Sequence, residues 1–195
     1  ENLIPSYLRF LRGVVDCEDL PLNVSRELLQ NSPVLNHIKN ALTKRILSDL
    51  EKKAKKKPED YAVFWKNFGA VMKEGIYEDY EQRERLMKLA RFRSTTQGDD
   101  LVSLEDYVSR MKDKQTEIYY VTGDDIDMVR KSPQLEGYAA RGIEVMLMTD
   151  AVDDFWVRSV TDFDGKPMKS VTQGGTALDD IAPEESTEDK PEAAP

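Results

Sequence analysis

The sequence has few of the residues that metal, redox and disulfide chemistry require. It contains one cysteine, Cys17, and one histidine, His37, among 195 residues. A single cysteine excludes an internal disulfide and a zinc site built from cysteines, and it is typical of a reducing compartment. We expect Cys17 to be inert because the neighbouring acids disfavour a thiolate. We interpret His37 as a helix residue, since it has no second histidine to share a metal with.

Long apolar runs and nucleotide-binding motifs are also absent. The apolar run at residues 145–148 is far shorter than the roughly 18 residues that a membrane-spanning helix needs. Neither G-x-G-x-x-G nor G-x-x-x-x-G-K-[ST] occurs, so we expect no nucleotide site in this chain. The chain opens with Glu1 and shows no signal-peptide pattern, which suggests a piece cut from a longer protein.

Charge is abundant and unevenly placed. Hydrophobic residues make up 39% of the chain and charged residues 33%, a globular composition, and the net charge is −9. Residues 176–195 hold seven acids and one lysine, which gives −6 and leaves −3 for the rest. We interpret this segment as an acidic flexible linker. The lysines of residues 52–57 lack interleaved aromatic residues, so we interpret them as a solvated helix end and expect no nucleic-acid partner.

Residues 32–100 have the periodicity of helices. In the first predicted helix, apolar residues recur at every fourth position: Val34, Ile38, Leu42, Ile46, Leu50 and Ala54. A second helix begins near Pro58 and has one broad apolar face: Tyr61, Phe64, Trp65, Phe68, Val71 and Met72. A third covers residues 79–92. Three helices with short connections predict a small bundle, and the wholly polar residues 93–100 predict a hinge after it.

The periodicity changes after the hinge. Ser103 and Asp106 have the spacing of a capping box. Apolar runs of strand length follow at residues 118–122, 144–149 and 168–172, separated by helical patterns at 125–141, with a restart at Pro133, and at 152–161. Alternating strands and helices predict a mostly parallel sheet with helices on its faces. The predicted fold class is therefore α/β: a three-helix bundle-like half followed by a small three-layer α/β/α sandwich.

Two groups of acids follow the first two predicted strands, where a parallel sheet places its ligand crevice. Such carboxylates could bind Mg²⁺, which would make the chain a magnesium-dependent enzyme using Asp124 and Asp150. Acids in the first turn of a helix also cap it and complement its dipole, and we favour this interpretation. The acids are Asp124, Asp125, Asp127, Asp150, Asp153 and Asp154.

Three large apolar residues stand in a row at Phe155, Trp156 and Val157. Successive helical residues are rotated by about 100°, so the three side chains cannot all face one sheet. At least one should be exposed. Phe155 and Trp156 are therefore candidate contacts for apolar segments of a partner, although a lone exposed aromatic residue is often without function.

Residues 19–30 (DLPLNVSRELLQ) contain a candidate catalytic pair. Arg26 and Gln30 lie one turn apart on the same face of a predicted short helix. An arginine in the first turn opposes the helix dipole and can reach an anion beyond the helix. Arg26 could equally form a local ion pair with Glu27, and spacing alone leaves both explanations open.

Four segments resemble a known family: residues 8–30 (LRFLRGVVDCEDLPLNVSRELLQ), 103–111 (SLEDYVSRM), 117–123 (EIYYVTG) and 162–167 (DFDGKP). In this order they resemble the middle domain of the heat shock protein ninety molecular chaperones, in the bacterial high-temperature protein G form. The resemblance extends to about Val171. It divides the chain into residues 1–31, the end of the large middle subdomain with the catalytic-loop motif; 32–100, a helical connector; 101–175, a small α/β/α subdomain; and 176–195, the linker.

The resemblance implies a cytoplasmic, homodimeric chaperone that is driven by ATP and binds unfolded or partly folded client proteins. ATP and Mg²⁺ would be bound by a separate N-terminal domain, and the dimer would form through a C-terminal domain. The family's catalytic loop matches the segment around Arg26, which would contact the γ-phosphate of ATP, and Gln30, which would support it. A passive protein-interaction module without any catalytic role is the alternative.

Overall fold

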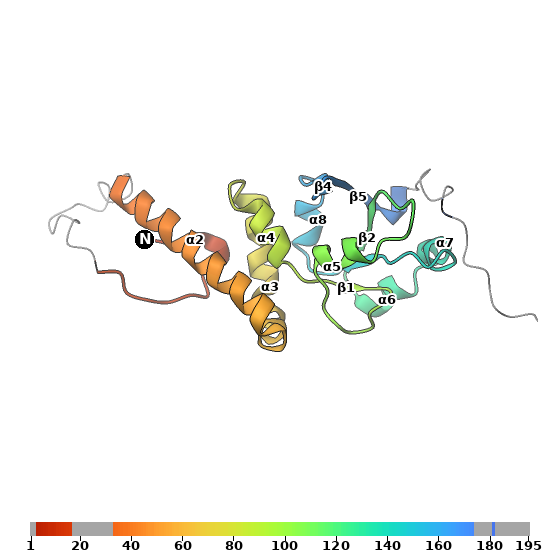
Figure 1. Ribbon diagram of the computed structural model, residues 1–195, viewed down its shortest axis with the longest axis horizontal. Helices are drawn as coiled ribbons and strands as arrows, with labels where there is room; N and C mark the ends of the chain where they lie inside the picture. The colour runs from red at the N-terminus through yellow and green to blue at the C-terminus, as the bar shows by residue number, and fades with distance from the viewer. Residues whose placement is uncertain (1–2, 17–32, 174–180, 182–195) are drawn as a thin grey trace, which may run out of the picture. The chain divides into compact units, whose positions relative to one another are not determined.

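The computed structural model describes residues 3–16, 33–173 and 181, and their contacts divide into two compact units (Figure 1). The first unit comprises Glu1–Arg91 together with Ala151–Ser159, and the second comprises Phe92–Asp150 with Val160–Pro195. The boundary between the two units therefore precedes residues 93–100, where the sequence predicted a hinge. The chain changes unit between Arg91 and Phe92, and the first two residues of the predicted hinge form a strand, β1 (Arg93–Ser94).

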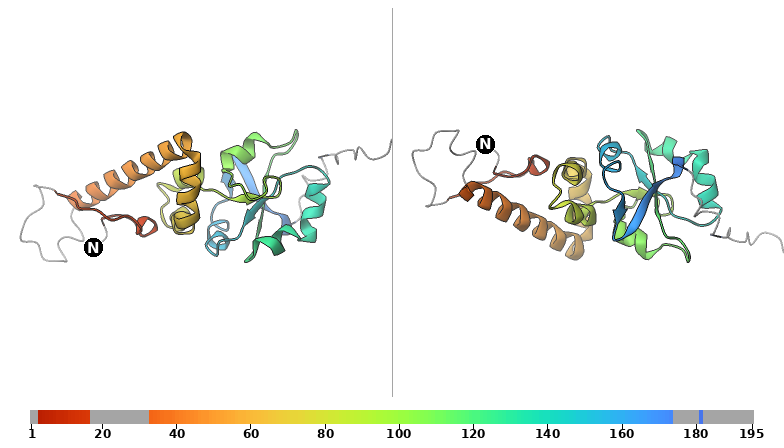
Figure 2. Two further views of the ribbon diagram at one scale, coloured as in Figure 1. Left: turned by 90° about the horizontal axis from the view of Figure 1, so that it is seen from below. Right: turned by 90° about the horizontal axis from the view of Figure 1, so that it is seen from above.

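The first unit is helical, as the periodicity predicts. Its elements are the 3₁₀ turn η1 (Ser6–Leu8), α2 (Pro33–Lys56), α3 (Pro58–Glu78), α4 (Arg83–Leu89) and the short α8 (Asp153–Trp156). Lys57 alone separates α2 from α3, and the two helices run at a marked angle to each other (Figure 2). Pro58 stands at the start of α3, where its missing N–H costs nothing.

The core of this unit is built around α3. Tyr61, Trp65 and Met72 of its predicted apolar face are buried, and Trp65 donates through Nε1 to the Arg91 carbonyl at 2.9 Å. Gly75 lets η1 approach α3 closely, because a Cβ there would lie 2.7 Å from Cγ of the buried Tyr7. The N-terminal segment is therefore a packed part of the helical unit.

The stripe predicted on α2 is only partly buried. Leu42 and Ile46 are half-buried and Val34 is exposed, whereas Thr43 and Leu47 are the two buried residues of this helix. A repeat of four residues drifts around a helix, so its members cannot all face the same neighbour. Thr43 satisfies its hydroxyl by donating to the Lys39 carbonyl at 2.8 Å.

The second unit contains a five-stranded sheet in the order β1-β3-β2-β5-β4. The strands β2 (Ile118–Thr122), β3 (Met146–Met148) and β5 (Lys166–Ser170) form the parallel centre, which confirms the predicted α/β class. The edges were not predicted: β1 and β4 (Asp162–Phe163) pair antiparallel with β3 and β5, respectively. Each edge strand has two residues, too few to show an alternating pattern.

Among the described residues, four helices and 3₁₀ turns of this unit lie between its strands, and a fifth follows the last strand, β5. They are α5 (Leu104–Ser109), α6 (Ile126–Arg130), η2 (Pro133–Leu135), α7 (Glu136–Ala139) and, after β5, η3 (Val171–Gln173). The predicted capping box is present, since Ser103 Oγ accepts from the Asp106 N–H and the Asp106 carboxylate accepts from the Ser103 N–H. The predicted restart at Pro133 is also present, because η2 begins there.

Residues on both faces of the central strands are buried. Tyr119 and Val121 pack into a core with residues of α6, η2 and α7, and the alternate residues Ile118 and Met146 are also buried. Ile181 joins this core with 6% of its surface exposed, and its carbonyl accepts from Arg141 Nε at 2.9 Å. Ile181 is therefore packed, and the other residues of the segment 176–195, predicted to be a flexible linker, lie outside the described residues. No helix in the described ranges combines the length and the hydropathy that crossing a membrane would require.

Candidate functional site: an aromatic surface on α3 and α8

Two of the predicted site residues, Arg26 and Gln30, lie outside the described residues, as does Cys17. The structure therefore leaves the catalytic-loop prediction as it stands. Phe155 and Trp156, the predicted client contacts, both lie in α8 of the helical unit. The sequence placed residues 152–161 with the sheet, but 151–159 pack with the helices, and the helix covers only Asp153–Trp156.

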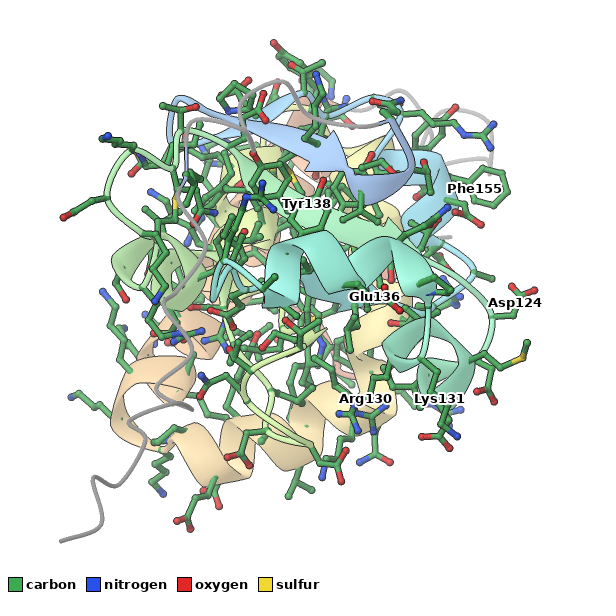
Figure 3. All side chains as sticks on the ribbon, turned by 90° about the vertical axis from the view of Figure 1, so that its right-hand side faces the viewer. Asp124, Arg130, Lys131, Glu136, Tyr138 and Phe155 are labelled. Atoms are coloured by element: carbon green, nitrogen blue, oxygen red, sulfur yellow. The ribbon has the colours of Figure 1, made fainter. Side chains whose placement is uncertain are left out.

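The three consecutive apolar residues divide between surface and core, as the rotation argument requires. Phe155 is 64% exposed and projects outward (Figure 3), whereas Trp156 is completely buried. Trp156 is therefore wrong as a direct client contact, because its indole is part of the core and has no surface to offer. Phe155 keeps that candidate role.

A buried polar network fixes α8 to α3. Lys73 Nζ of α3 lies 2.9 Å from Asp153 Oδ1 and donates to Oδ2 at 3.0 Å. Trp156 Nε1 donates to the same Asp153 Oδ1 at 2.8 Å. The side chains of Lys73 and Asp153 are only 3% and 0% exposed. A buried ion pair of this geometry orients the helix that carries Phe155, because rotating α8 would break the contact between the two buried charges.

Phe155 borders a pocket of about 320 Å³ on the surface of the helical unit. Tyr77 of α3 is 56% exposed and lines the pocket with Phe155, so two aromatic side chains from segments far apart in sequence meet there. The remaining lining residues are Glu74, Glu78, Ala151 and Val152. We call these six residues the aromatic surface.

The acidic part of the aromatic surface is tied to the N-terminal segment. Arg9 donates to both carboxylate oxygens of Glu74, from Nη1 at 2.5 Å and from Nη2 at 2.8 Å. These hydrogen bonds hold the pKa of Glu74 below its ordinary value. The Ser6 hydroxyl donates a hydrogen bond to the Glu78 carboxylate. Glu74 is therefore ionised near neutral pH, and these hydrogen bonds hold both side chains at the rim of the pocket.

Sequence reasoning missed the α3 contribution to this surface. Tyr77 lies outside the apolar face predicted for α3, and no sequence motif singles out Glu74 or Glu78. A signal was present, because Tyr77 is a large aromatic residue on the polar side of an amphipathic helix. Its partner, Phe155, could be found only from the fold.

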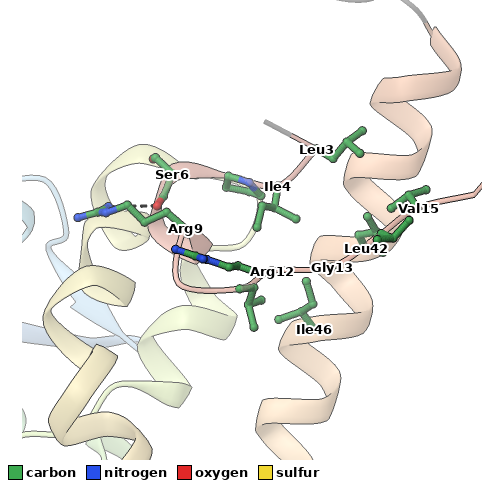
Figure 4. Close-up of a pocket in the computed structure, with 12 residues that line it drawn as sticks. Leu3, Ile4, Ser6, Arg9, Arg12, Gly13, Val15, Leu42 and Ile46 are labelled. Carbon is green, nitrogen blue, oxygen red and sulfur yellow. Dashed lines mark hydrogen bonds between the residues drawn. The ribbon is translucent and has the colours of Figure 1, made fainter. Parts of the chain in front are cut away.

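A second pocket in the helical unit, about 570 Å³ in volume, lies between the N-terminal segment and α2 (Figure 4). Leu3, Ile4, Leu42 and Ile46 give it a mostly apolar lining, and Arg9 and Arg12 supply its charged groups. None of its lining residues, all of which the structure describes, is an acid, a histidine or a cysteine.

The acids that follow the strands do not assemble a metal site. Asp125 caps α6, with Oδ1 accepting from the N–H groups of Asp127 and Met128 at 2.9 Å, which confirms the capping interpretation. Asp153 is paired with Lys73. Within the described ranges, no group of three or more acids, histidines and cysteines could hold a metal ion. The magnesium-enzyme hypothesis therefore finds no support here.

Comparison with known proteins identifies the family. The model of the family described as "Hsp90 protein" matches residues 1–194. Three similar relatives each carry the description "Chaperone protein HtpG". The chain is 54% identical to that of Roseobacter denitrificans over 193 residues, covering 99% of this chain and 31% of the relative. It is 58% identical to that of Mesorhizobium japonicum over 180 residues (92% and 29%) and 53% identical to that of Rhodopseudomonas palustris over 194 residues (100% and 30%).

These matches agree with the sequence resemblance and cover nearly the whole chain. The chain nevertheless spans only 29% to 31% of the length of these relatives. The match of the family model over both compact units, together with identities above one half, shows that the chain belongs to the Hsp90 family.

Proposed function

We propose that this chain is the later part of the middle region of an Hsp90-type chaperone and contacts unfolded or partly folded client proteins through the aromatic surface. The observation that carries the proposal is the exposure of Phe155 beside Tyr77 on a rigid support. Exposed aromatic side chains around a shallow pocket offer apolar contact area, the feature that unfolded chains share. The buried Lys73–Asp153 ion pair already fixes the position of α8, and with it Phe155, before any client protein binds.

Client binding can be tested with the 195-residue chain and a permanently unfolded probe, reduced and carboxymethylated α-lactalbumin. Phe155→Ser should weaken binding at least threefold, because it removes apolar contact area without disturbing the core. Met128→Ser is the matched control, since Met128 is 76% exposed and belongs to the other unit. Equal affinities of the two variants for the probe would refute the assignment of the surface.

The catalytic part of the proposal concerns Arg26 and Gln30, which the sequence resemblance assigns to the family's catalytic loop. ATP and Mg²⁺ would be bound by an N-terminal domain outside this chain. Phosphoryl transfer develops charge on the equatorial oxygens of the γ-phosphate, and a planar guanidinium that is always ionised stabilises that charge. Delivery of Arg26 from another domain would couple hydrolysis to domain closure. The fragment by itself should show no ATPase activity.

The Arg26 assignment is testable in the complete chaperone. Arg26→Ala should leave ATP affinity nearly unchanged and lower kcat by about 10³-fold, the scale seen when an arginine finger is lost. Arg26→Lys retains the charge but not the planar fork, so it should recover only part of the rate. Turnover that survives in Arg26→Ala would overturn the assignment.

A passive interaction module is the second candidate, because the aromatic surface needs no nucleotide to bind an apolar segment. Arg26 would then only pair with Glu27. Under this alternative, reversing the charges of both Arg26 and Glu27 should restore the stability that either single reversal loses. The catalytic role predicts instead that ATP hydrolysis stays abolished in the double variant. Homodimerisation through a C-terminal domain and a cytoplasmic location also belong to the proposal, on the strength of the family resemblance.

A further inference from the structure

The aromatic surface carries negative charge and no positive charge of its own. Its six lining residues, all of them described, comprise two exposed aromatic side chains, two carboxylates and two small apolar residues. None is a lysine or an arginine. A pocket that served only to bury apolar side chains would gain nothing from carboxylates at its rim, since their desolvation opposes binding.

The two carboxylates differ in what already neutralises them. Glu74 is paired with the Arg9 guanidinium through both of its oxygens. Glu78 accepts a hydrogen bond from the neutral hydroxyl of Ser6, which brings no charge. Asp154, next to Phe155 on α8, is exposed and adds a further negative charge nearby. Arg9 interacts electrostatically with Glu78 as well, but its hydrogen bonds go to Glu74, so among the described residues Glu78 is the rim carboxylate that has no ion pair.

We propose that the aromatic surface selects client segments in which a lysine or arginine stands beside a large apolar residue. The apolar side chain packs against Phe155 and Tyr77, and the cation binds the Glu78 carboxylate. This inference rests on the proposed client-binding function and adds the chemical class of the segment. A cation at this rim is attracted twice, by the carboxylate and by the faces of the two aromatic rings.

The same arrangement selects against acidic segments. An aspartate or glutamate beside the apolar residue would approach Glu78 and Asp154, and like charges across an interface disfavour the complex. A segment with serine in that position would keep the apolar contact and lose only the charge pair. The expected order of affinity is therefore cationic, then neutral, then acidic.

The test uses the 195-residue chain and three fluorescein-labelled peptides of 12 residues with identical leucine and phenylalanine positions. The intervening residues are lysine in one peptide, serine in the second and glutamate in the third. Fluorescence anisotropy at low ionic strength should show the lysine peptide binding about two- to fivefold more tightly than the serine peptide, the range for a partly exposed ion pair. Added salt should reduce this preference.

Glu78→Gln identifies the carboxylate responsible. It should abolish most of the preference for the lysine peptide over the serine peptide. Glu59→Gln is the matched control, because Glu59 is exposed and lies at the other end of α3. The substitution changes the net charge by the same amount as Glu78→Gln. The control separates a local contact from the general attraction of a chain of net charge −9 for any cationic peptide. Circular dichroism spectra matching the parent confirm that both variants fold.

The outcomes distinguish the two proposals. Equal affinity for the lysine and serine peptides, or equal effects of Glu78→Gln and Glu59→Gln, overturns the charge selection. If Phe155→Ser still weakens binding of the serine peptide in that case, client binding at the aromatic surface stands and only the selectivity is lost. If Phe155→Ser changes the binding of no peptide, both proposals fail together.

Discussion

Replacing Asp153 by asparagine should strongly destabilise the helical unit. The carboxylate is completely buried, lies 2.9 Å from Lys73 Nζ and accepts from Trp156 Nε1 at 2.8 Å. Asparagine keeps the shape and can still accept from the indole, but it removes the negative charge that Asp153 places 2.9 Å from the buried ammonium of Lys73. Breaking a buried pair in this way costs about 3 to 5 kcal/mol. That is a large part of the roughly 5 to 15 kcal/mol by which domains are stable.

The assay for Asp153→Asn is urea unfolding followed by tryptophan fluorescence. The only two tryptophans of the sequence, Trp65 and Trp156, both belong to the helical unit, so the signal reports on that unit alone. Asp154→Asn is the control, because the neighbouring side chain is exposed and its loss should change the free energy of unfolding by less than about 0.5 kcal/mol.

A double variant tests the physical reason. In Lys73→Met with Asp153→Leu both charges are gone, so no buried ion remains unpaired and much of the stability should return. A free energy of unfolding for Asp153→Asn within about 0.5 kcal/mol of the parent chain, a change typical of surface sites, would refute a stabilising role of the buried pair. The physical reason would be refuted if the double variant were less stable than Asp153→Asn.

Two further predictions concern polar contacts in the two units. Tyr107→Phe should destabilise the α/β unit by about 1 to 3 kcal/mol, because the buried hydroxyl donates to the Glu144 carbonyl at 2.8 Å and accepts from the Tyr119 N–H at 2.9 Å; an unchanged Tm by circular dichroism would contradict this. The hydrogen bonds from Arg9 lower the pKa of Glu74 in the folded state. The ionised Glu74 therefore stabilises the fold fully above its ordinary pKa of 4.5, and this stabilisation is lost as pH falls through its folded-state pKa. Glu74→Gln should therefore cost up to about 1 kcal/mol near pH 7 and almost nothing at pH 2, as measured by urea unfolding across this range, and a difference independent of pH would count against the pairing.

Local patterns account for most of what was correctly predicted. A short window of sequence is enough to predict the helices of the first unit and the parallel strands of the second, which show apolar patterns. The capping box at Ser103 is equally local, because it depends on the spacing of Ser103 and Asp106. The interpretation of Asp125 as a helix cap succeeded for the same reason, since a cap contacts residues only two and three positions away. The match to one family along the whole chain is also a property of the sequence.

Contacts between distant segments account for the errors. The strands β1 and β4 are two residues long and exist only because a neighbouring strand offers them hydrogen bonds. Ile181 looked like part of a polar tail because its apolar partners lie elsewhere in the chain. Residues 152–161 were assigned to the sheet by their place in the strand order, and the buried Lys73–Asp153 pair places α8 with the helices instead.

The sequence by itself determined that at least one of the consecutive residues Phe155, Trp156 and Val157 must face solvent, because helix geometry turns neighbours apart. Only the tertiary structure decided which one. Trp156 is buried because its indole N–H finds the carboxylate that Lys73 also binds, and this leaves Phe155 outside, beside Tyr77. Asp153 is only three positions from Trp156, but Lys73 lies 80 positions from Asp153, and no local pattern encodes a pairing over that distance.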